Sequence, residues 1–300
     1  MNSAKNPLLS VLLPVHQGED FLDETLETVI NQTFSDFELI ILDNLSTDDS
    51  PEIIKKFREK DSRIKYILDS KRRNGNDCLS ELVKHANGEY CMVINDDNIL
   101  DSNFFFTLIN NIKNQDQYQW VITNGVYINK EKKKIKNFFS NKCYLGENIN
   151  IFKISIFYLR GDVIPLILPS ICKTEIYRSL LPYVNLSKFE NDADTVMGFK
   201  ILANLNIKYI QQELIFCRIY EDHQRYHSFE IPTKYLSFLC EKIFHEINLL
   251  KHLWSIVATS HLPILQKIFL VSFLPILMLV KAIKIFLYKN LSLIKRIIIR

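Results

Sequence analysis

The sequence lacks the patterns that mark several common classes of protein. Its six cysteines include no Cys-x-x-Cys pair. We therefore expect buried free thiols in a reducing compartment, with disulfides or a zinc site as the less favoured alternatives. The first apolar run continues as "PVHQGED" instead of Gly-x-Gly-x-x-Gly, which argues against a dehydrogenase of the Rossmann type. The N-terminal apolar stretch is short and broken by Pro14, so we expect no signal peptide and a cytoplasmic protein.

Acidic residues are absent from the last part of the chain. The 300-residue sequence is 47% hydrophobic and 24% charged, as in a globular protein, and its formal net charge is +3. Between Ile247 and Arg300 there are eight Lys or Arg and no Asp or Glu, so the remainder carries a net negative charge. This asymmetry argues against nucleic acid as a partner and singles out the C-terminal region.

Apolar runs alternate with helix-like segments up to about residue 129. Strands are predicted at 8–14, 37–43, 63–69 and 89–96, and helices at 19–32, 46–61, 78–88 and from 101 onward. This alternation predicts an α/β fold with parallel strands. Polar residues follow each predicted strand, at the edge where such sheets bind ligands. Residues 120–139 suggest a hairpin with a lysine-rich tip.

The stretch "YCMVINDDNIL" places Asp96 and Asp97 after a buried strand. Two carboxylates at that edge are suitable ligands for Mg²⁺ or Mn²⁺, which would share the oxygens of a diphosphate. The alternative is that one of them caps the following helix. Asp43 ends the second strand, and cations near a third strand end could meet phosphates unless they lie in a solvated loop. These cations are Lys71, Arg72 and Arg73.

Several motifs, in order and at the right spacing, resemble the family 2 glycosyltransferases of the GT-A fold. Residues 8–50 resemble the family's opening, in which a strand ends in Pro-Val and a later strand leads to Asp-Asp-Gly-Ser-Thr-Asp. "NGEYCMVINDDNIL" resembles the strand that runs into the family's acidic DXD motif, with Asn95 in place of the first aspartate. The resemblance covers roughly the first 110 residues and implies a Rossmann-like mixed sheet flanked by helices.

The resemblance also implies roles for individual residues. Pro14 and Val15 would line the nucleotide pocket, and Asp43 would contact the base or ribose. Asp97 matches the metal-binding acid, and Asp96 its neighbour near the ribose or diphosphate. Apart from the resemblance, the position of Arg72 after the third strand leads us to expect that it meets the donor phosphates. Because an amide brings no charge, Asn95 is expected to weaken the metal site.

The second half of the chain resembles the acceptor side of the same family. "KFENDADTVMGFKI" is similar to the segment that supplies the catalytic base. By that motif Asp192 is the predicted base, with Glu190 and Asp194 as alternatives; all three could instead simply favour a helix N-terminus. "FCRIYEDHQRYHS" is similar to the closing Arg-x-His stretch. Arg218 matches its arginine, Tyr220 stands at the histidine position, and a histidine at 223 or 227 could replace it.

The last 70 residues have long apolar stretches with dispersed lysines. Only 13 residues separate Lys267 from Lys281 and Pro275 interrupts them, whereas a spanning helix needs about 20 apolar residues. We expect helices lying in the interface of an anionic membrane; a span, or packing on the domain or on a second subunit, are the alternatives. The predicted organisation is a GT-A domain at 1–230 and a helical, membrane-associating appendage at 231–300.

Together these features predict an inverting, metal-dependent glycosyltransferase of the hexosyl- or N-acetylhexosaminyltransferase type. It would use a nucleotide-sugar donor, expected to be UDP-linked, with Mn²⁺ or Mg²⁺, and a glycan or lipid-linked acceptor in surface polysaccharide biosynthesis. It would be cytoplasmic and peripheral on the inner face of the cell membrane. The alternative is a degenerate GT-A module that binds nucleotide or glycan, or scaffolds an assembly complex, without turnover.

Overall fold

The computed structural model forms two compact units. One comprises Met1–Ile149 with Pro165–His223, and the other Asn150–Ile164 with Gln224–Arg300. The predicted domain boundary at residue 230 and the membrane-associating appendage stay predictions. The structure describes residues 6–138, 148–149, 170–184, 197, 200–201, 203–219, 254–255, 257–260, 263–264 and 267. In the second unit, residues 254–255 and 257–259 are helical.

The first unit begins with strands and helices in strict alternation. They are β1 (Leu9–Val15), α1 (Leu22–Ile30), β2 (Phe37–Asp43), α2 (Ser50–Lys60), β3 (Ile64–Leu68), α3 (Gly75–His85) and β4 (Tyr90–Val93). Every residue of β2 is buried, and so is every residue of β1 except Pro14. Strands buried on both faces read as continuous apolar runs, which is why the sequence pattern located them.

The rest of the first unit extends the same sheet. Its described elements are β5 (Asn98–Leu100), α4 (Phe104–Lys113), β6 (Trp120–Ile128), β7 (Lys134–Asn137), β8 (Asn148–Ile149), β9 (Ser170–Lys173), α6 (Thr174–Val184) and β10 (Ile207–Arg218). β6 and β7 pair antiparallel, which confirms the predicted hairpin. Its turn contains Lys132 in the left-handed backbone region, with φ of 63°.

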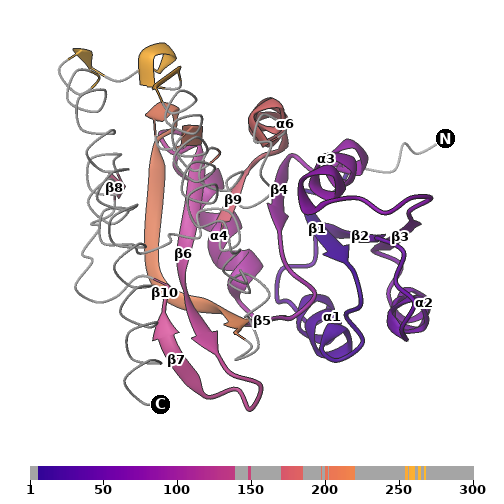
Figure 1. The fold of residues 1–300 in the computed structure, drawn as a ribbon. Coiled ribbons are helices and arrows are strands. Elements are labelled where there is room, and N and C mark those ends of the chain that lie inside the picture. Colours follow the sequence, from indigo (N-terminus) through magenta and orange to yellow (C-terminus); the bar gives the residue numbers. More distant parts are fainter. Residues whose placement is uncertain are drawn as a thin grey trace, which may run out of the picture. The chain divides into compact units, whose positions relative to one another are not determined.

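The strand order is β3-β2-β1-β4-β9-β6-β10-β5, with β7 beside β6 and β8 beside β10. The first four strands are parallel, β9 runs antiparallel to both β4 and β6, and β10 is parallel to β6. The sheet is therefore mixed, as predicted. Helices α1 and α2 lie on one face of the parallel half and α3 on the other (Figure 1). Because β1, β2 and β4 are parallel, their carboxyl ends meet at one edge.

The predicted strand at 89–96 is too long, and the predicted helix from 101 begins too early. β4 ends at Val93, the short strand β5 follows, and α4 begins only at Phe104. The cause is a tight turn, in which Asn95 N–H donates to the Asn98 side-chain oxygen (2.8 Å) and Asn98 N–H donates to the Asn95 carbonyl (3.3 Å). The two aspartates lie inside this turn and not before a helix, so the helix-cap interpretation is wrong.

The described cysteines are Cys78, Cys91, Cys172 and Cys217, and all four are buried and free. This confirms the prediction for those four, while Cys143 and Cys240 lie outside the described residues. Burial raises the pKa of the Cys78 thiol to about 11, so this thiol stays protonated at neutral pH. Such thiols serve as apolar packing groups.

Candidate active site

The loop after β1 and the loop after β2 are joined by hydrogen bonds at the carboxyl edge of the sheet. Gln17 N–H donates to the Ser46 hydroxyl oxygen (3.1 Å), and Gly18 N–H donates to the Ser50 hydroxyl oxygen (2.9 Å). In return, the Gln17 side-chain oxygen accepts from Thr47 N–H (2.6 Å). These bonds pair backbone N–H groups of both loops and hold the two strand ends together as one rim.

The turn at residues 95–98, which contains Asp96 and Asp97 and is called the acidic turn below, is the third part of this rim. Its backbone is held from two sides. The Asp96 carbonyl accepts from the Thr25 hydroxyl of α1 (2.9 Å). The Asp97 carbonyl accepts from the Arg218 guanidinium at the end of β10 (2.7 Å). The Asn98 amide, which is fully buried, donates to the Asp97 carboxylate (3.2 Å). The two carboxylates are thus presented by a backbone that both α1 and β10 anchor.

The Asp96 carboxylate lies against the loop that follows β1. Its Oδ2 accepts from His16 N–H at 3.4 Å, and a Cβ at Gly18 would stand only 2.8 Å from the same oxygen. A larger residue at position 18 would displace the carboxylate. Burial and, after it, the neighbouring charge of Asp97 raise the pKa of Asp96 to about 7.

These two acids are chemically suited to a divalent cation. Desolvation and a second carboxylate raise the pKa of a carboxyl group. A cation that neutralises both charges lowers that pKa again and so favours the ionised form. Within the described residues no cluster of three or more His, Cys, Asp or Glu could hold a metal. Mg²⁺ and Mn²⁺ commonly take only one or two carboxylates and complete their coordination with water and substrate phosphate oxygens. The carboxylates of Asp96 and Asp97 fit that type of site.

Asp43 is fully buried at the end of β2, and both carboxylate oxygens are already engaged. Oδ1 accepts from Ser46 N–H (2.8 Å), and Oδ2 accepts from the Tyr66 hydroxyl of β3 (3.0 Å). Burial and this bond to a carboxylate raise the pKa of Tyr66 to about 12, so the hydroxyl stays a donor. Asp43 is therefore held in a fixed orientation and is closed to solvent in this structure.

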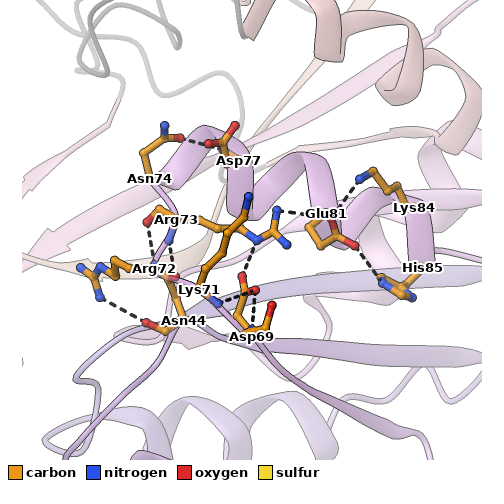
Figure 2. A network of polar contacts seen from close by, with 11 residues as sticks. Asn44, Asp69, Lys71, Arg72, Arg73, Asn74, Asp77, Glu81, Lys84 and His85 are labelled. Carbon is orange, nitrogen blue, oxygen red and sulfur yellow. Dashed lines mark hydrogen bonds and ion pairs between the residues drawn. The ribbon is translucent and has the colours of Figure 1, made fainter.

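The three cations after β3 have different surroundings (Figure 2). Arg73 folds back to form ion pairs with Asp69 and with Glu81 (3.5 Å), and its backbone N–H donates to the Asn44 side chain (2.8 Å). Arg72 is exposed, and its guanidinium donates to the Asn44 carbonyl (3.2 Å). Lys71 is also exposed. Arg73 therefore stabilises the loop, and Arg72 holds its charge at the surface next to the end of β2.

The predicted site residues that the structure describes do gather at this rim. Val15 is buried and contributes its carbonyl, which accepts from Asn44 N–H (2.9 Å), while Pro14 is partly exposed. The predicted base Asp192 lies outside the described residues. So do Glu190, Asp194, Tyr220, His223 and His227.

Sequence reasoning did not find four residues that hold the rim: Glu24, Thr25, Tyr66 and Asn98. No local pattern marks Glu24, Thr25 or Tyr66, because each acts through a partner from another element. Asn98 comes closest to a signal, since an asparagine directly after two acids is typical of a turn.

The fold and the rim of carboxylates define a GT-A protein, the architecture of nucleotide-diphospho-sugar transferases. The sequence model described as glycosyl transferase family 2 matches residues 10–166, just over half of the chain. The chain belongs to this family.

Similar proteins include two bacterial glucosyltransferases. The chain is 28% identical over 165 residues to a GalNAc(5)-diNAcBac-PP-undecaprenol beta-1,3-glucosyltransferase of Campylobacter jejuni, a match covering 50% of this chain and 53% of that protein. It is 30% identical over 97 residues to a poly(ribitol-phosphate) beta-glucosyltransferase of Bacillus spizizenii, covering 31% and 15%. The chain thus spans about half, or less, of the length of these curated relatives.

Solved structures share the fold at low sequence identity. Residues 1–349 of Staphylococcus aureus TarS, in complex with UDP-GlcNAc, match with a TM-score of 0.67 and 14% identity, over 89% of this chain and 71% of that one. The mannosyltransferase PcManGT of Pyrobaculum calidifontis, in complex with GDP-Man and Mn²⁺, matches with a TM-score of 0.51 and 15% identity, over 93% and 70%. In the part of the chain that the structure describes, no helix is long and apolar enough to cross a bilayer.

Proposed function

We propose that the protein is an inverting, metal-dependent glycosyltransferase that uses a nucleotide-sugar donor, UDP-linked in the first instance. The observation that carries the proposal is the pair of carboxylates at Asp96 and Asp97, held by their backbone at the carboxyl edge of the sheet. Family membership supports transfer chemistry, and the raised pKa of Asp96 supports a cation between the pair.

The donor would lie across the rim with its nucleoside over β1 and β2 and its diphosphate at the acidic turn. Asp43 would accept a hydrogen bond from the base or ribose, beside Pro14 and Val15. Arg72 would meet the phosphates, because its guanidinium is exposed next to the end of β2. Asp97 would be the metal ligand, and Asp96 would lie beside it, near the ribose or diphosphate.

Transfer requires charge stabilisation on one side of the sugar and proton removal on the other. A bound Mn²⁺ or Mg²⁺ would neutralise the charge that develops on the leaving diphosphate. Asp192 would accept the proton of the acceptor hydroxyl as its oxygen attacks C1 from the opposite face, so the anomeric configuration inverts. Asn95 brings no charge to the turn, so the cation would depend on diphosphate oxygens for tight binding.

The acceptor would be a glycan or a lipid-linked glycan in the assembly of a bacterial surface polysaccharide. The named activities of the Campylobacter and Bacillus relatives support this class of acceptor. The basic C-terminal region, with eight Lys or Arg and no acidic residue, would hold the protein on an anionic membrane, at its cytoplasmic face.

A thermal-shift screen of nucleotide sugars with and without Mn²⁺ tests the proposed function. A donor at about 100 times its Kd stabilises the folded state by about 2.7 kcal/mol, which raises Tm by roughly 5 to 10 °C for a domain of this size. We expect that shift with a UDP-sugar and Mn²⁺ together, and a clearly smaller one without the metal. A donor that binds but never releases its nucleotide in the presence of candidate acceptors would instead support the non-catalytic module. No shift with any nucleotide sugar would contradict both.

Mn²⁺ affinity should depend on pH because Asp96 must lose its proton to meet the cation. With a pKa of about 7, the apparent affinity should rise up to tenfold per pH unit between pH 5 and 7 and level off above pH 7.5. The sign is opposite for the metal-free protein. A carboxyl whose folded pKa is raised contributes stability that is present below pH 4 and is lost as the pH rises through 7.

Isothermal titration calorimetry with Mn²⁺ across this pH range, together with thermal melts of the metal-free protein, measures both trends. Asp96→Asn removes the titrating group and should flatten the metal-free stability profile between pH 4 and 7. A Mn²⁺ affinity of the unaltered protein that is constant from pH 5 to 8 would show that Asp96 does not contribute to the metal site.

A further inference from the structure

Arg218 reaches from the end of β10 to the backbone of the acidic turn. Its side chain is 1% exposed, and one guanidinium nitrogen donates to the Asp97 carbonyl at 2.7 Å. The other terminal nitrogen forms an ion pair with Glu24 of α1. The guanidinium also lies over the Phe21 ring, with its central carbon 4.3 Å from the ring centroid. The planar side chain is therefore fixed by three contacts in different directions.

Burying this guanidinium has a cost that the protein does not fully recover by pairing. Its Nε–H is buried and has no hydrogen-bond partner among the described residues. A buried donor without a partner typically costs about 1–3 kcal/mol. Glu24 is 33% exposed and also pairs with Lys132 (2.6 Å), so the exposed lysine already neutralises the charge of Glu24. A buried ion pair of this kind is weak evidence for a role in stability.

The elements that Arg218 connects have other anchors. β10 is paired along its length with β6, and at its end with β5. α1 packs through Leu22, Leu26 and Val29, which are fully buried. The acidic turn is an irregular segment between two short strands, held at the Asp96 carbonyl by Thr25 and at Asn95 N–H by the Asn98 side chain. Arg218 holds the carbonyl of Asp97 itself, the residue that bears the predicted metal-binding carboxylate, so we expect this contact to matter most for the site.

We propose that Arg218, oriented by Glu24, is a positioning residue for the acidic turn. It fixes the Asp97 carbonyl and thereby holds the Asp97 carboxylate in the direction needed to bind a divalent cation. It touches neither the donor nor the metal. The proposal rests on the proposed function, because it assigns a supporting residue to the same metal site.

Arg218→Lys tests this role, because lysine keeps the charge but not the planar fork that reaches a carbonyl and a carboxylate together. Removing a group that orients a metal ligand typically weakens metal affinity by about 10- to 100-fold. We expect an increase of that size in the Kd for Mn²⁺ alone, measured by calorimetry at pH 8. Glu24→Gln should change the Kd in the same direction by a smaller factor.

Arg63→Lys is a matched control. Arg63 also donates to a backbone carbonyl, that of Ile30 (3.0 Å), pairs with Asp61 (2.6 Å) and lies over the Phe37 ring at 4.0 Å. It holds the other end of α1, away from the acidic turn. Its side chain is 27% exposed against 1% for Arg218, so its substitution should lower the thermal stability somewhat less than Arg218→Lys does and leave the Mn²⁺ affinity within about twofold.

The outcomes separate this inference from the proposed function. If the unaltered protein binds neither Mn²⁺ nor any nucleotide sugar, the proposed function fails and this inference fails with it. If the unaltered protein binds Mn²⁺, and Arg218→Lys binds it equally well while losing stability like Arg63→Lys, only the positioning role is overturned. A selective loss of Mn²⁺ affinity in Arg218→Lys supports it.

Discussion

Asp97→Asn should reduce the rate of sugar transfer by about 10²- to 10³-fold while the protein stays folded. Asparagine keeps an oxygen that can accept the bond from the Asn98 amide, so the turn is preserved and only the charge is lost. Removing one electrostatic contact to a transition state commonly costs a factor of this size. Transfer would be measured with the donor identified by the thermal-shift screen, with saturating Mn²⁺ and at saturating donor, so that the loss appears in kcat.

The same substitution has a second expected effect. The charge of Asp97 contributes to the raised pKa of Asp96, so its removal should move the midpoint of the metal-free stability profile to lower pH. Asp101→Asn is the matched control, because among the described residues that side chain accepts from Asn103 N–H (2.9 Å) before α4, and the variant should keep its activity. An Asp97→Asn protein with unchanged kcat and unchanged Mn²⁺ affinity would refute the assignment of Asp97 as the metal ligand.

Asp192→Asn should lower the rate of sugar transfer by about 10²- to 10⁴-fold and leave donor binding unchanged. A general base contributes to the transition state of proton removal, whereas in the proposed site the donor and the metal are bound by other residues. The two measurements are therefore the initial rate of product formation and the thermal shift produced by donor with Mn²⁺. The base assignment requires that only the first of them changes.

Glu190→Gln and Asp194→Asn are the natural comparisons, because they remove neighbouring carboxylates from the same segment. Each should retain activity within a few-fold if Asp192 is the base. A large loss in one of these variants, with full activity in Asp192→Asn, would move the assignment to that residue. Equal retention of activity in all three would mean that the segment supplies no base.

Much of the fold was predictable from the sequence for a local reason. β1 and β2 are buried on both faces, so burial alone makes them apolar runs that are visible without a structure. α1 carries Leu22, Leu26 and Val29 at helical spacing, and all three are buried. Where a boundary depended on a turn, as at the end of β4, the prediction was wrong. The Asn98 side chain, which follows the strand, accepts from Asn95 N–H and turns the backbone there.

The candidate site was predictable in position but not in detail. Asp43, Asp96 and Asp97 were expected at one edge because parallel strands bring their carboxyl ends together, and the motifs of the family gave the same residues. The bond from the Tyr66 hydroxyl to Asp43 was not predictable, since nothing in β3 marks that side chain as a partner. The same holds for Glu24, which reaches Arg218 across 194 positions.

The sequence by itself determined the order of strands and helices, the polar residues at each strand end and the family to which the chain belongs. These features follow from burial periodicity and from short motifs, which extend over only a few residues. Only the tertiary structure decided that Asp96 has a pKa of about 7 and that Arg218 holds the Asp97 carbonyl. Both depend on which distant segments exclude water from a group and which donors they bring within hydrogen-bond distance, and folding alone fixes those distances.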